Sequence, residues 1–352
     1  MNALPPGSTI GILGGGQLGR MLAMSAAQLG YRCHIFAPER NSVAAEVSAS
    51  FTNADWHDTE ALIDFARDCD VITYEFENVP VGPLARLPQE LLAPGPRALE
   101  VAQDRVREKR FIQDAGGTPA DFVAIDHDSE LADAVERIGV PGILKTRRDG
   151  YDGKGQWAIN ERADAHGVRI PESGCIYEAR LNFECEFSVI LVRGRDGEMR
   201  FWDSTRNRHD DGILAHSELP APAIVDAQLE QAREMARKVA DALGYVGVLT
   251  LEFFATANGP IFNEMAPRVH NSGHWTIEGA RTSQFENHIR AICGLPLGAT
   301  DSLAETIVMN NLIGEQALDL AGHLSNPHAH VHLYGKSEAR ARRKMGHITR
   351  VG

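Results

Sequence analysis

Cysteine and long apolar runs are scarce in this sequence. Its five cysteines, at positions 33, 69, 175, 185 and 293, form no C-x-x-C pair and no metal-binding spacing. This pattern argues against a disulfide scaffold and suits a reducing compartment. No stretch approaches the ~18 apolar residues of a membrane helix, and the N-terminus lacks the pattern of a secretory signal. We therefore expect a cytoplasmic protein that does not span a membrane.

Positive charge is also in deficit. The 352 residues include 35 Lys and Arg against 48 Asp and Glu, so the formal net charge is −13. Such a balance argues against a general nucleic-acid binder, although it permits local basic pockets for phosphate groups. A hydrophobic content of 43% is ordinary for a soluble enzyme, and the length allows two or three domains.

A glycine-rich loop follows a short apolar run at residues 141–156, PGILKTRRDGYDGKGQ. The run carries Lys145, and the loop has glycines at 150, 153 and 155. Backbone N–H groups of such a loop can close over phosphate oxygens, and Lys145 would add a positive charge there. The spacing is not that of a P-loop. The alternative interpretation is a hairpin tip with a solvated lysine.

A predicted β-hairpin within residues 245–268 carries two acidic residues. With a three-residue loop at 257–259, Glu252 faces Glu264, and the amide of Asn263 lies beside them. A two-residue loop would set Glu252 opposite Met265, on the other face. We predict the three-residue loop, because paired carboxylates suit Mg²⁺ held jointly with phosphates. The alternative is two solvent-facing glutamates on an edge hairpin. No H-E-x-x-H zinc motif occurs.

The first part of the chain reads as an α/β domain. We predict a strand at 8–13, a glycine-rich turn at 14–19, a helix at 20–30 and a strand at 32–37. This G-x-G-x-x-G context, with Glu39 near the position of a ribose-binding acid, makes a nicotinamide dehydrogenase the main alternative function. The same geometry also fits a phosphate-bearing substrate at a helix N-terminus.

Acidic and amide side chains follow the next predicted strand, at residues 71–73. Glu75 and Asn78 stand where open α/β sheets bind ligands, so they could reach ribose hydroxyls or ring nitrogens of a substrate. The alternative is that they cap a helix or shape the turn before Pro80.

Composition shifts suggest the domain boundaries. Pro94-Gly95-Pro96 reads as a linker, followed by one charged helix at 97–115 whose basic side chains mostly face solvent. We predict an N-terminal domain at 1–96, a second domain at 97–296 and a β-rich C-terminal module at 297–352. The second domain would contain a small α/β lobe at 118–180 and a metal-binding lobe at 181–296.

Two polar clusters complete the candidate site. RVHNSGHWT, directly after Glu264, places Arg268, His270 and His274 where a compact anion could bind, although a polar turn before a helix near Thr276 explains the same residues. The C-terminal module holds the other cluster, a dense cationic run that suits a phosphate monoester or, alternatively, is solvated. Its residues are Lys336, Arg340, Arg343 and Lys344.

Five sequence blocks together resemble a known enzyme family. They are GGGQLGRM at 14–21, YEFENV at 74–79, GYDGKGQ at 150–156, NEMAPRVHNSGHWT at 263–276 and GKSEARARRKMGH at 335–347. The glycine loop and paired acids resemble the ATP-grasp superfamily, and all five blocks resemble its 5-(carboxyamino)imidazole ribonucleotide synthases. The resemblance implies an α/β ATP-grasp fold with a Rossmann-like N-terminal domain and a small C-terminal β-rich module.

The resemblance also implies a reaction and its ligands. The expected reaction is carboxylation of the amine of 5-aminoimidazole ribonucleotide in purine biosynthesis, using ATP and bicarbonate through carboxyphosphate. The expected cofactor is Mg²⁺ on Glu252 and Glu264, and the expected assembly is a homodimer. Another ATP-grasp ligase acting on a phosphorylated amine is the nearest alternative. A non-catalytic binding module would lack the acidic pair or Lys145.

Site residues are carried over from the family by position. Glu186 could be an ordinary strand residue and His209 a surface histidine, and the sequence leaves both readings open. The expected catalytic residues are Tyr151, Asp152, Arg268, His270 and His274. The expected ATP-binding residues are Arg105, Lys145, Gly150, Tyr151, Asp152, Gly153, Lys154, Gly155, Gln156, Glu178, Ala179, Arg180, Leu181, Glu186, His209, Asn263 and Glu264. The expected ribonucleotide-binding residues are Gln17, Leu18, Glu75, Asn78, Lys336, Arg340, Arg343 and Lys344.

Overall fold

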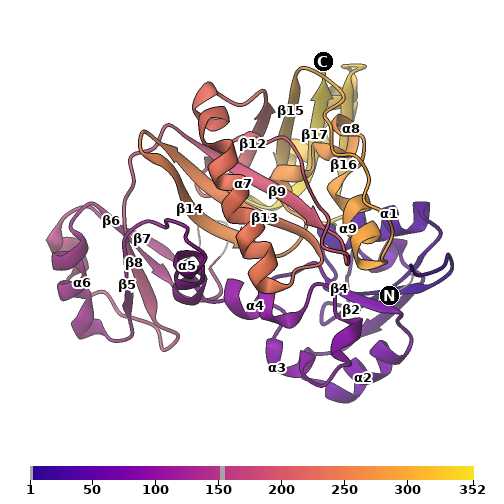
Figure 1. The fold of residues 1–352 in the computed structure, drawn as a ribbon, viewed down its shortest axis with the longest axis horizontal. Coiled ribbons are helices and arrows are strands. Elements are labelled where there is room, and N and C mark those ends of the chain that lie inside the picture. The colour runs from indigo at the N-terminus through magenta and orange to yellow at the C-terminus, as the bar shows by residue number, and fades with distance from the viewer. Residues whose placement is uncertain (1–2, 151–154) are drawn as a thin grey trace.

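The computed structural model describes residues 3–150 and 155–352 (Figure 1). Within these residues the strands form an N-terminal sheet, a small-lobe sheet and a nine-stranded central sheet. Helices and strands alternate along the N-terminal part, which confirms the predicted α/β class.

The N-terminal sheet is parallel throughout, in the order β3-β2-β1-β4. The predicted strands at 8–13, 32–37 and 71–73 are confirmed within a residue. The first helix begins at Gln17, three residues before the predicted start, with Gly16 as its N-cap residue. The elements are β1 (Thr9–Leu13), α1 (Gln17–Gln28), β2 (Arg32–Ala37), β3 (Ser50–Asn53), α2 (Thr59–Arg67), β4 (Val71–Tyr74) and α3 (Val81–Leu84).

The predicted single helix at 97–115 is wrong. The chain forms two helices there, α4 (Pro96–Ala102) and α5 (Arg105–Asp114). Asp104 separates them because its extended backbone and carboxylate start a new helix, accepting the N–H groups of Val106 at 3.0 Å and Arg107 at 3.1 Å. The break changes the direction of the chain, and α5 packs against strand β14 (Gly259–Ala266) of the central sheet.

The small lobe is an antiparallel sheet in the order β5-β8-β6-β7 with one helix against it. Its core includes Leu144, Ile159 and Tyr177, all at most 1% exposed. In Figure 1 this lobe lies apart from the central sheet, with α5 between them. The elements are β5 (Phe122–Ile125), α6 (Leu131–Ile138), β6 (Gly142–Thr146), β7 (Gln156–Ile159) and β8 (Cys175–Ala179).

The central sheet joins the second domain to the C-terminal strands. Its order is β14-β13-β9-β11-β12-β15-β17-β16, and β10 pairs with β9. Ser217 of β12 pairs with Met309 of β15, so the predicted C-terminal module extends this sheet. The strands are β9 (Cys185–Arg193), β10 (Met199–Phe201), β11 (Arg206–Asp210), β12 (Ile213–Leu219), β13 (Gly247–Thr256), β14, β15 (Ile307–Ile313), β16 (Ala329–Leu333) and β17 (Lys344–Val351).

Helices cover this sheet and bury its apolar side chains. The long helix α7 (Ala223–Leu243) crosses β9 and β13 in Figure 1, burying residues such as Ala232, Ala236 and Val239. The helix α9 (Gln284–Ile292) packs between the central sheet and α1, which ties the N-terminal domain to the rest. The short helices are α8 (Thr276–Gly279) and α10 (Leu320–Leu324). Glu77, just after β4, forms an ion pair with Arg268, just after β14, so the carboxyl end of β4 lies near the β13–β14 hairpin.

Candidate functional site

The paired carboxylates lie opposite each other on the β13–β14 hairpin. Glu252 pairs with Glu264 in the register, as predicted. The predicted loop is wrong, because Thr256 pairs with Gly259 across a two-residue turn. A β-bulge corrects the register: Phe253 pairs with Phe262, so Asn263 is the extra residue on β14. Gly259, at φ +116°, adopts a conformation that other residues rarely take.

The Glu252 carboxylate is buried without full compensation. The residue is 6% exposed, and its Oε1 has no hydrogen-bond partner among the described residues. Burial raises its pKa to about 7, and the charges of Glu264 and Glu186 add to the effect while His209 opposes it. Glu264 is more open, with 42% of its side chain exposed. A hard cation between two such carboxylates would stabilise both.

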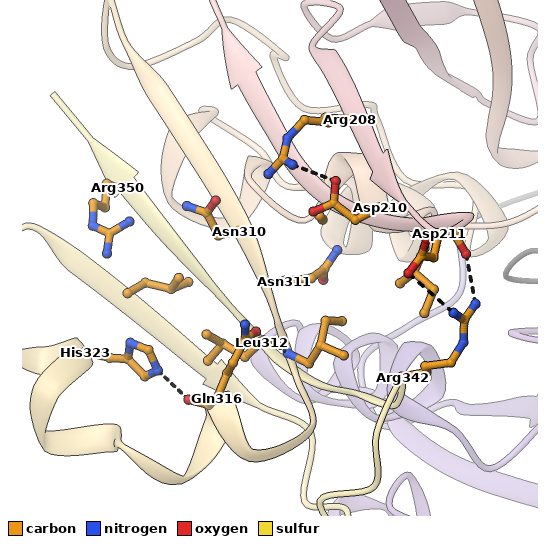
Figure 2. A pocket seen from close by; sticks show the side chains of 14 residues that line it. Arg208, Asp210, Asp211, Asn310, Asn311, Leu312, Gln316, His323, Arg342 and Arg350 are labelled. Carbon is orange, nitrogen blue, oxygen red and sulfur yellow. Dashed lines mark hydrogen bonds and ion pairs between the residues drawn. The ribbon is translucent and has the colours of Figure 1, made fainter.

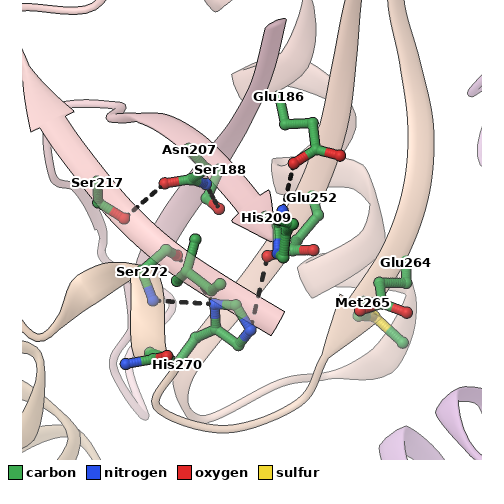
Figure 3. Close-up of polar contacts among 12 residues, drawn as sticks. Glu186, Ser188, Asn207, His209, Ser217, Glu252, Glu264, Met265, His270 and Ser272 are labelled. Atoms are coloured by element: carbon green, nitrogen blue, oxygen red, sulfur yellow. Dashed lines mark hydrogen bonds and ion pairs between the residues drawn. The ribbon is translucent and has the colours of Figure 1, made fainter. Parts of the chain in front are cut away.

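Near the Glu252–Glu264 pair, Glu186 on β9 is hydrogen-bonded to His209 on β11 (Figure 3). Burial disfavours the charged imidazole, but the hydrogen bond that His209 donates to Glu186 and the charge of Glu252 raise the pKa of His209 to about 9. His209 is therefore a cation at neutral pH. Neither residue is an ordinary exposed strand or loop residue, since about three quarters of each side chain is buried.

Two lysines share one buried carboxylate in the small lobe. Glu178 Oε2 lies 2.9 Å from Lys145 Nζ and 3.4 Å from Lys109 Nζ. Burial alone would raise the pKa of Glu178, but the charges of Lys145 and Lys109 outweigh it and lower the pKa to about 2. Lys109 was not predicted, and it is 1% exposed although its helix was expected to present its basic residues to solvent. Lys109 lies four residues after Arg105, and this spacing places both side chains on the same face of a helix, which was the available sequence signal.

Arg105 connects the glycine loop to the acidic pair. Its Nη1 donates to Glu264 Oε2 at 3.2 Å, and its Nη2 donates to the Gly150 carbonyl at 3.3 Å. The residue is 9% exposed. On the far side of the loop, the Gly155 carbonyl accepts the N–H of Thr146 at 2.8 Å. The predicted residues Tyr151, Asp152, Gly153 and Lys154 lie outside the described residues.

The link between the two lobes is the predicted adenine-binding edge. Ala179 ends β8 of the small lobe, and residues 180–181 begin the connection to β9 of the central sheet. The N–H of Ala179 donates to the Asp121 carbonyl at 2.9 Å, and that of Arg180 donates to the Pro141 carbonyl at 3.2 Å. Both bonds fix the backbone of this segment against the small lobe.

The anion-binding candidates after Glu264 separate into two groups. Arg268 forms an ion pair with Glu77, and His270 Nε2 lies 3.6 Å from Glu252 Oε1. Figure 3 shows the His270 ring between Ser272 and Glu252. His274 is different: it is 1% exposed, and its Nδ1 accepts from Gln284 at 3.1 Å. Its ring lies beside Phe285, Tyr334 and His347, and its contact with a bound anion stays a prediction.

The glycine-rich turn of the N-terminal domain is occupied by the protein itself. Glu75 Oε1 accepts the N–H of Gly16 at 2.8 Å, and its Oε2 accepts that of Gly19 at 3.2 Å. A Cβ built at Gly14 would lie 2.6 Å from the Glu75 side chain. The helix N-terminus expected to hold a ligand phosphate therefore binds a carboxylate, which argues against the dehydrogenase reading. Glu75 is buried in this role.

The other N-terminal candidates differ in exposure. Gln17 and Asn78 are partly exposed, at the start of α1 and in the turn after β4. Leu18 is 8% exposed and packs in the hydrophobic core, so only its backbone can contact a ligand. Glu77, in the same turn as Asn78, was not predicted, because a lone turn acid carries no signal of its buried partner Arg268.

The C-terminal cationic cluster lies on the connection between β16 and β17. Lys336 Nζ donates to the Lys344 carbonyl at 2.7 Å and lies 5.6 Å from the centre of the Tyr334 ring. Arg343 donates to the Glu338 carbonyl at 3.0 Å, and Arg340 pairs with the Glu338 carboxylate. The Lys344 charge affects the pKa of Glu77, Glu252 and His270, so this end of the cluster faces the acidic pair.

A cavity of about 550 Å³ lies elsewhere on the central sheet (Figure 2). Arg342 and Asp211 close one side of it, with the Arg342 guanidinium donating to the Asp211 carbonyl at 2.9 Å. None of the predicted site residues lines it. Its lining residues are Arg208, Asp210, Asp211, Ile213, Ala215, Asn310, Asn311, Leu312, Ile313, Gln316, His323, Arg342, Ile348 and Arg350.

Residues 3–150 and 155–352 contain neither a membrane-spanning helix nor a cluster of metal-binding side chains. No helix there is long and apolar enough to cross a membrane. No group of three or more His, Cys, Asp or Glu side chains is arranged to hold a metal ion. All five cysteines are free and buried.

Three family matches cover most of the chain. Residues 8–103 match the ribonucleotide synthetase preATP-grasp domain, residues 110–285 match the ATP-grasp domain, and residues 307–352 match the phosphoribosylaminoimidazole carboxylase C-terminal domain. The N5-carboxyaminoimidazole ribonucleotide synthase of Brucella melitensis biotype 1 is 48% identical, over 99% of this chain and 98% of its own length. The enzyme of that name from Bacillus subtilis is 42% identical, over 98% and 91%.

Solved structures of proteins with the same name are also similar. An ADP complex of an N5-carboxyaminoimidazole ribonucleotide synthetase matches with a TM-score of 0.94 and 39% identity, covering 100% of this chain and 94% of its own. A synthase from Aspergillus clavatus in complex with ADP and 5-aminoimidazole ribonucleotide matches with a TM-score of 0.87 and 32% identity. That match covers 98% of this chain and 94% of the other.

Proposed function

Because the chain belongs to the N5-carboxyaminoimidazole ribonucleotide synthase family of ATP-grasp ligases, we propose that it carboxylates the amine of 5-aminoimidazole ribonucleotide. ATP and bicarbonate are the co-substrates, and ADP and phosphate leave with the carboxylated product. The observation that carries this proposal is the pairing of buried Glu252 with Glu264 beside Arg268 and His270, in a chain similar to the family over its whole length.

The metal in this proposal is Mg²⁺ on Glu252 and Glu264. The donor set fits, because Glu252 Oε1 is a buried carboxylate oxygen with no hydrogen-bond partner among the described residues. The two acids would supply oxygen ligands, and the nucleotide phosphates would supply others. The metal would neutralise phosphate charge when bound. Arg105, which already contacts Glu264, would add a fixed positive charge on the same side.

The nucleotide would lie between the two lobes. Lys145 and the glycine loop at 150–156 would bind phosphates, and residues 178–181 would bind the adenine. Glu186 would bind the ribose, and the cationic His209 beside it would stabilise nearby negative charge. Phosphoryl transfer requires little covalent chemistry from the protein, so positioning and charge neutralisation do the catalysis.

Bicarbonate would lie at Arg268 and His270. Arg268 supplies charge, and Glu77 fixes its guanidinium. Burial, together with the nearby charge of Arg268, holds the pKa of His270 well below its ordinary value, so this ring is neutral and hydrogen-bonds as a neutral donor or acceptor. ATP would convert bicarbonate, a poor electrophile, into carboxyphosphate, which carries a better leaving group. Tyr151 and Asp152 would lie beside the acceptor amine, and closure of their loop would exclude water.

The ribonucleotide would span the N-terminal and C-terminal parts. Lys336, Arg340, Arg343 and Lys344 would hold its phosphate, because they form a dense cationic cluster in a chain of net charge −13. Gln17, the Leu18 backbone, Glu75 and Asn78 would contact the remainder. Both carboxylate oxygens of Glu75 already accept hydrogen bonds from Gly16 and Gly19, so only their remaining lone pairs could contact the ribonucleotide.

The domain division, assembly and location remain part of the proposal. We keep boundaries at 96 and 296, supported by the linker and by the separate N-terminal sheet. A homodimer rests on the family resemblance, and sedimentation of the purified chain would test it. A cytoplasmic location is supported by five buried cysteines that form no disulfide.

One assay tests the activity. ADP release would be measured with Mg-ATP and bicarbonate, with and without 5-aminoimidazole ribonucleotide, and against closely related amines. We expect release to depend on the ribonucleotide and on bicarbonate. Equal release with an unrelated phosphorylated amine would point to another ATP-grasp ligase.

A further inference from the structure

Lys109 occupies a position that the proposed reaction does not yet explain. It lies on α5, with its ammonium 3.4 Å from Glu178 Oε2 in the small lobe and 3.3 Å from the Asn263 carbonyl on the β13–β14 hairpin. Its side chain is 1% exposed, against 8% for Lys145. A lysine is almost never buried to this extent unless its charge is paired. Lys109 is therefore held by both lobes, whereas Lys145 is the more accessible partner.

The two lysines and Glu178 carry one positive charge in excess. Both ammonium groups lie near the same oxygen, Oε2, and Glu178 Oε1 is buried with no hydrogen-bond partner among the described residues. Without a ligand, Lys145 forms the closer ion pair, at 2.9 Å. To bind a phosphate oxygen, Lys145 must give up part of that ion pair. A buried carboxylate that loses its only cation is strongly disfavoured.

We propose that Lys109 is a positioning residue that keeps the Glu178 carboxylate paired while Lys145 transfers to the nucleotide phosphates. The inference rests on the proposed nucleotide-binding role of Lys145. It deepens that role by adding an exchange of partners. A ligand phosphate takes the more accessible Lys145 from Glu178, and Lys109 stays as the cation that pairs with the Glu178 carboxylate. The Asn263 carbonyl prevents Lys109 from following, because it holds the ammonium toward the hairpin.

A double-mutant cycle tests this exchange. ADP affinity would be measured by titration calorimetry, with Mg²⁺, for the full chain and for K109M, E178Q and K109M/E178Q. K109M should weaken ADP binding about ten-fold, because release of Lys145 then leaves Glu178 unpaired. In the E178Q background the same substitution should change affinity less than about two-fold, because no charge remains to be left unpaired. The measurements belong at a temperature where all four proteins are folded.

Three further variants exclude simpler explanations. K109R keeps the charge and should retain affinity near that of the unmodified protein, whereas a loss of packing alone would affect it as well. K238M removes an exposed lysine of α7 and should change nothing. K109Q replaces K109M if the latter does not fold. The Michaelis constant for 5-aminoimidazole ribonucleotide should move far less than ADP affinity.

Each outcome decides between distinct readings. An ADP affinity unchanged in K109M would overturn the inference and leave Lys109 a structural residue. Equal weakening in both backgrounds would overturn it too, since Lys109 would then act without Glu178. If the unmodified protein failed to bind Mg-ADP at all, the proposed function itself would be wrong, and the role of Lys109 would fall with it.

Discussion

Glu178 and Glu252 are both strand glutamates, and both are at most 6% exposed, yet their electrostatic environments are opposite. Glu178 has two lysine ammonium groups at one oxygen, and its pKa is lowered to about 2. For Glu252, burial raises the pKa to about 7, because the charge of His209 only partly offsets burial and the charges of Glu264 and Glu186. Burial is equal in the two cases, so the neighbours decide the sign of the shift.

The difference indicates which site the protein completes by itself. Cations of the chain neutralise Glu178, and this arrangement is stable without a ligand. Both carboxylates keep one oxygen without a hydrogen-bond partner among the described residues, but Glu252 also pairs with the like-charged Glu264, an arrangement that favours an external cation. Four substitutions test this difference between the two carboxylates and their neighbours.

Removing the carboxylate that the protein neutralises should damage the fold most. Glu178→Gln leaves the ammonium groups of Lys145 and Lys109 buried beside each other. We expect the free energy of unfolding to fall by about 3–5 kcal/mol, the usual cost of breaking a buried pair by deleting one partner. Denaturant titration at neutral pH measures it, with exposed Glu184→Gln as the control. A loss under about 1 kcal/mol would show that the lysines are not held by Glu178.

Removing a carboxylate of the unneutralised pair should instead damage activity. Glu264→Ala should lower Mg²⁺-dependent ATP turnover at least about 100-fold, because a bound metal supplies several kcal/mol of charge stabilisation. The fold should survive, since 42% of the side chain is exposed. Initial rates and a thermal unfolding curve separate the two effects, with Glu184→Ala as the control. Turnover near that of the unmodified protein would remove Glu264 from the metal site.

A third experiment extends the contrast to the cations. Arg343→Ala removes a charge-assisted contact worth about 1.5–3 kcal/mol, so the Michaelis constant for 5-aminoimidazole ribonucleotide should rise roughly ten-fold or more. The constant for ATP should barely change, because Lys145 serves that ligand. The neighbouring Arg342→Ala is a matched control, since its guanidinium contacts Asp211. A rise only in the constant for ATP would reassign the cluster to the nucleotide.

The smallest expected effect is a pH-dependent increase in the free energy of unfolding when Glu252 is replaced by Gln. The pKa of Glu252 is raised in the folded state, so the native protein retains a proton that the unfolded chain has lost between pH 4.5 and about 7. Stability from this group is present below pH 4.5 and is lost as pH rises toward 7. Without Mg²⁺ or nucleotide, Glu252→Gln should be more stable than the unmodified protein above pH 7, by on the order of 1 kcal/mol.

Thermal unfolding across pH 5–8 would measure that gain, and the two curves should converge toward the acid end. Glu184→Gln, which alters an exposed acid, should show no such convergence. A Glu252→Gln variant that is less stable at every pH would mean that the protein already compensates the Glu252 charge.

Short-range features of the chain could be predicted from its sequence. The strands at 9–13, 32–37 and 71–74 follow from runs of β-branched and apolar residues. Propensity and alternation act over a few residues, so they can be read without knowing what packs nearby. The family assignment also came from sequence, because several motifs occur in one order along the chain.

Only the tertiary structure decided how the charges are partnered. The bulge at Asn263, rather than the turn, sets the facing of the two acids, and Asp104 breaks a helix that composition reads as continuous. Packing buries Lys109 against Glu178, and it places Glu75 in the glycine turn where a ligand phosphate was expected. These outcomes depend on elements far apart in sequence. Local patterns do not encode which cation meets which carboxylate, because that is settled when the domains close around one another.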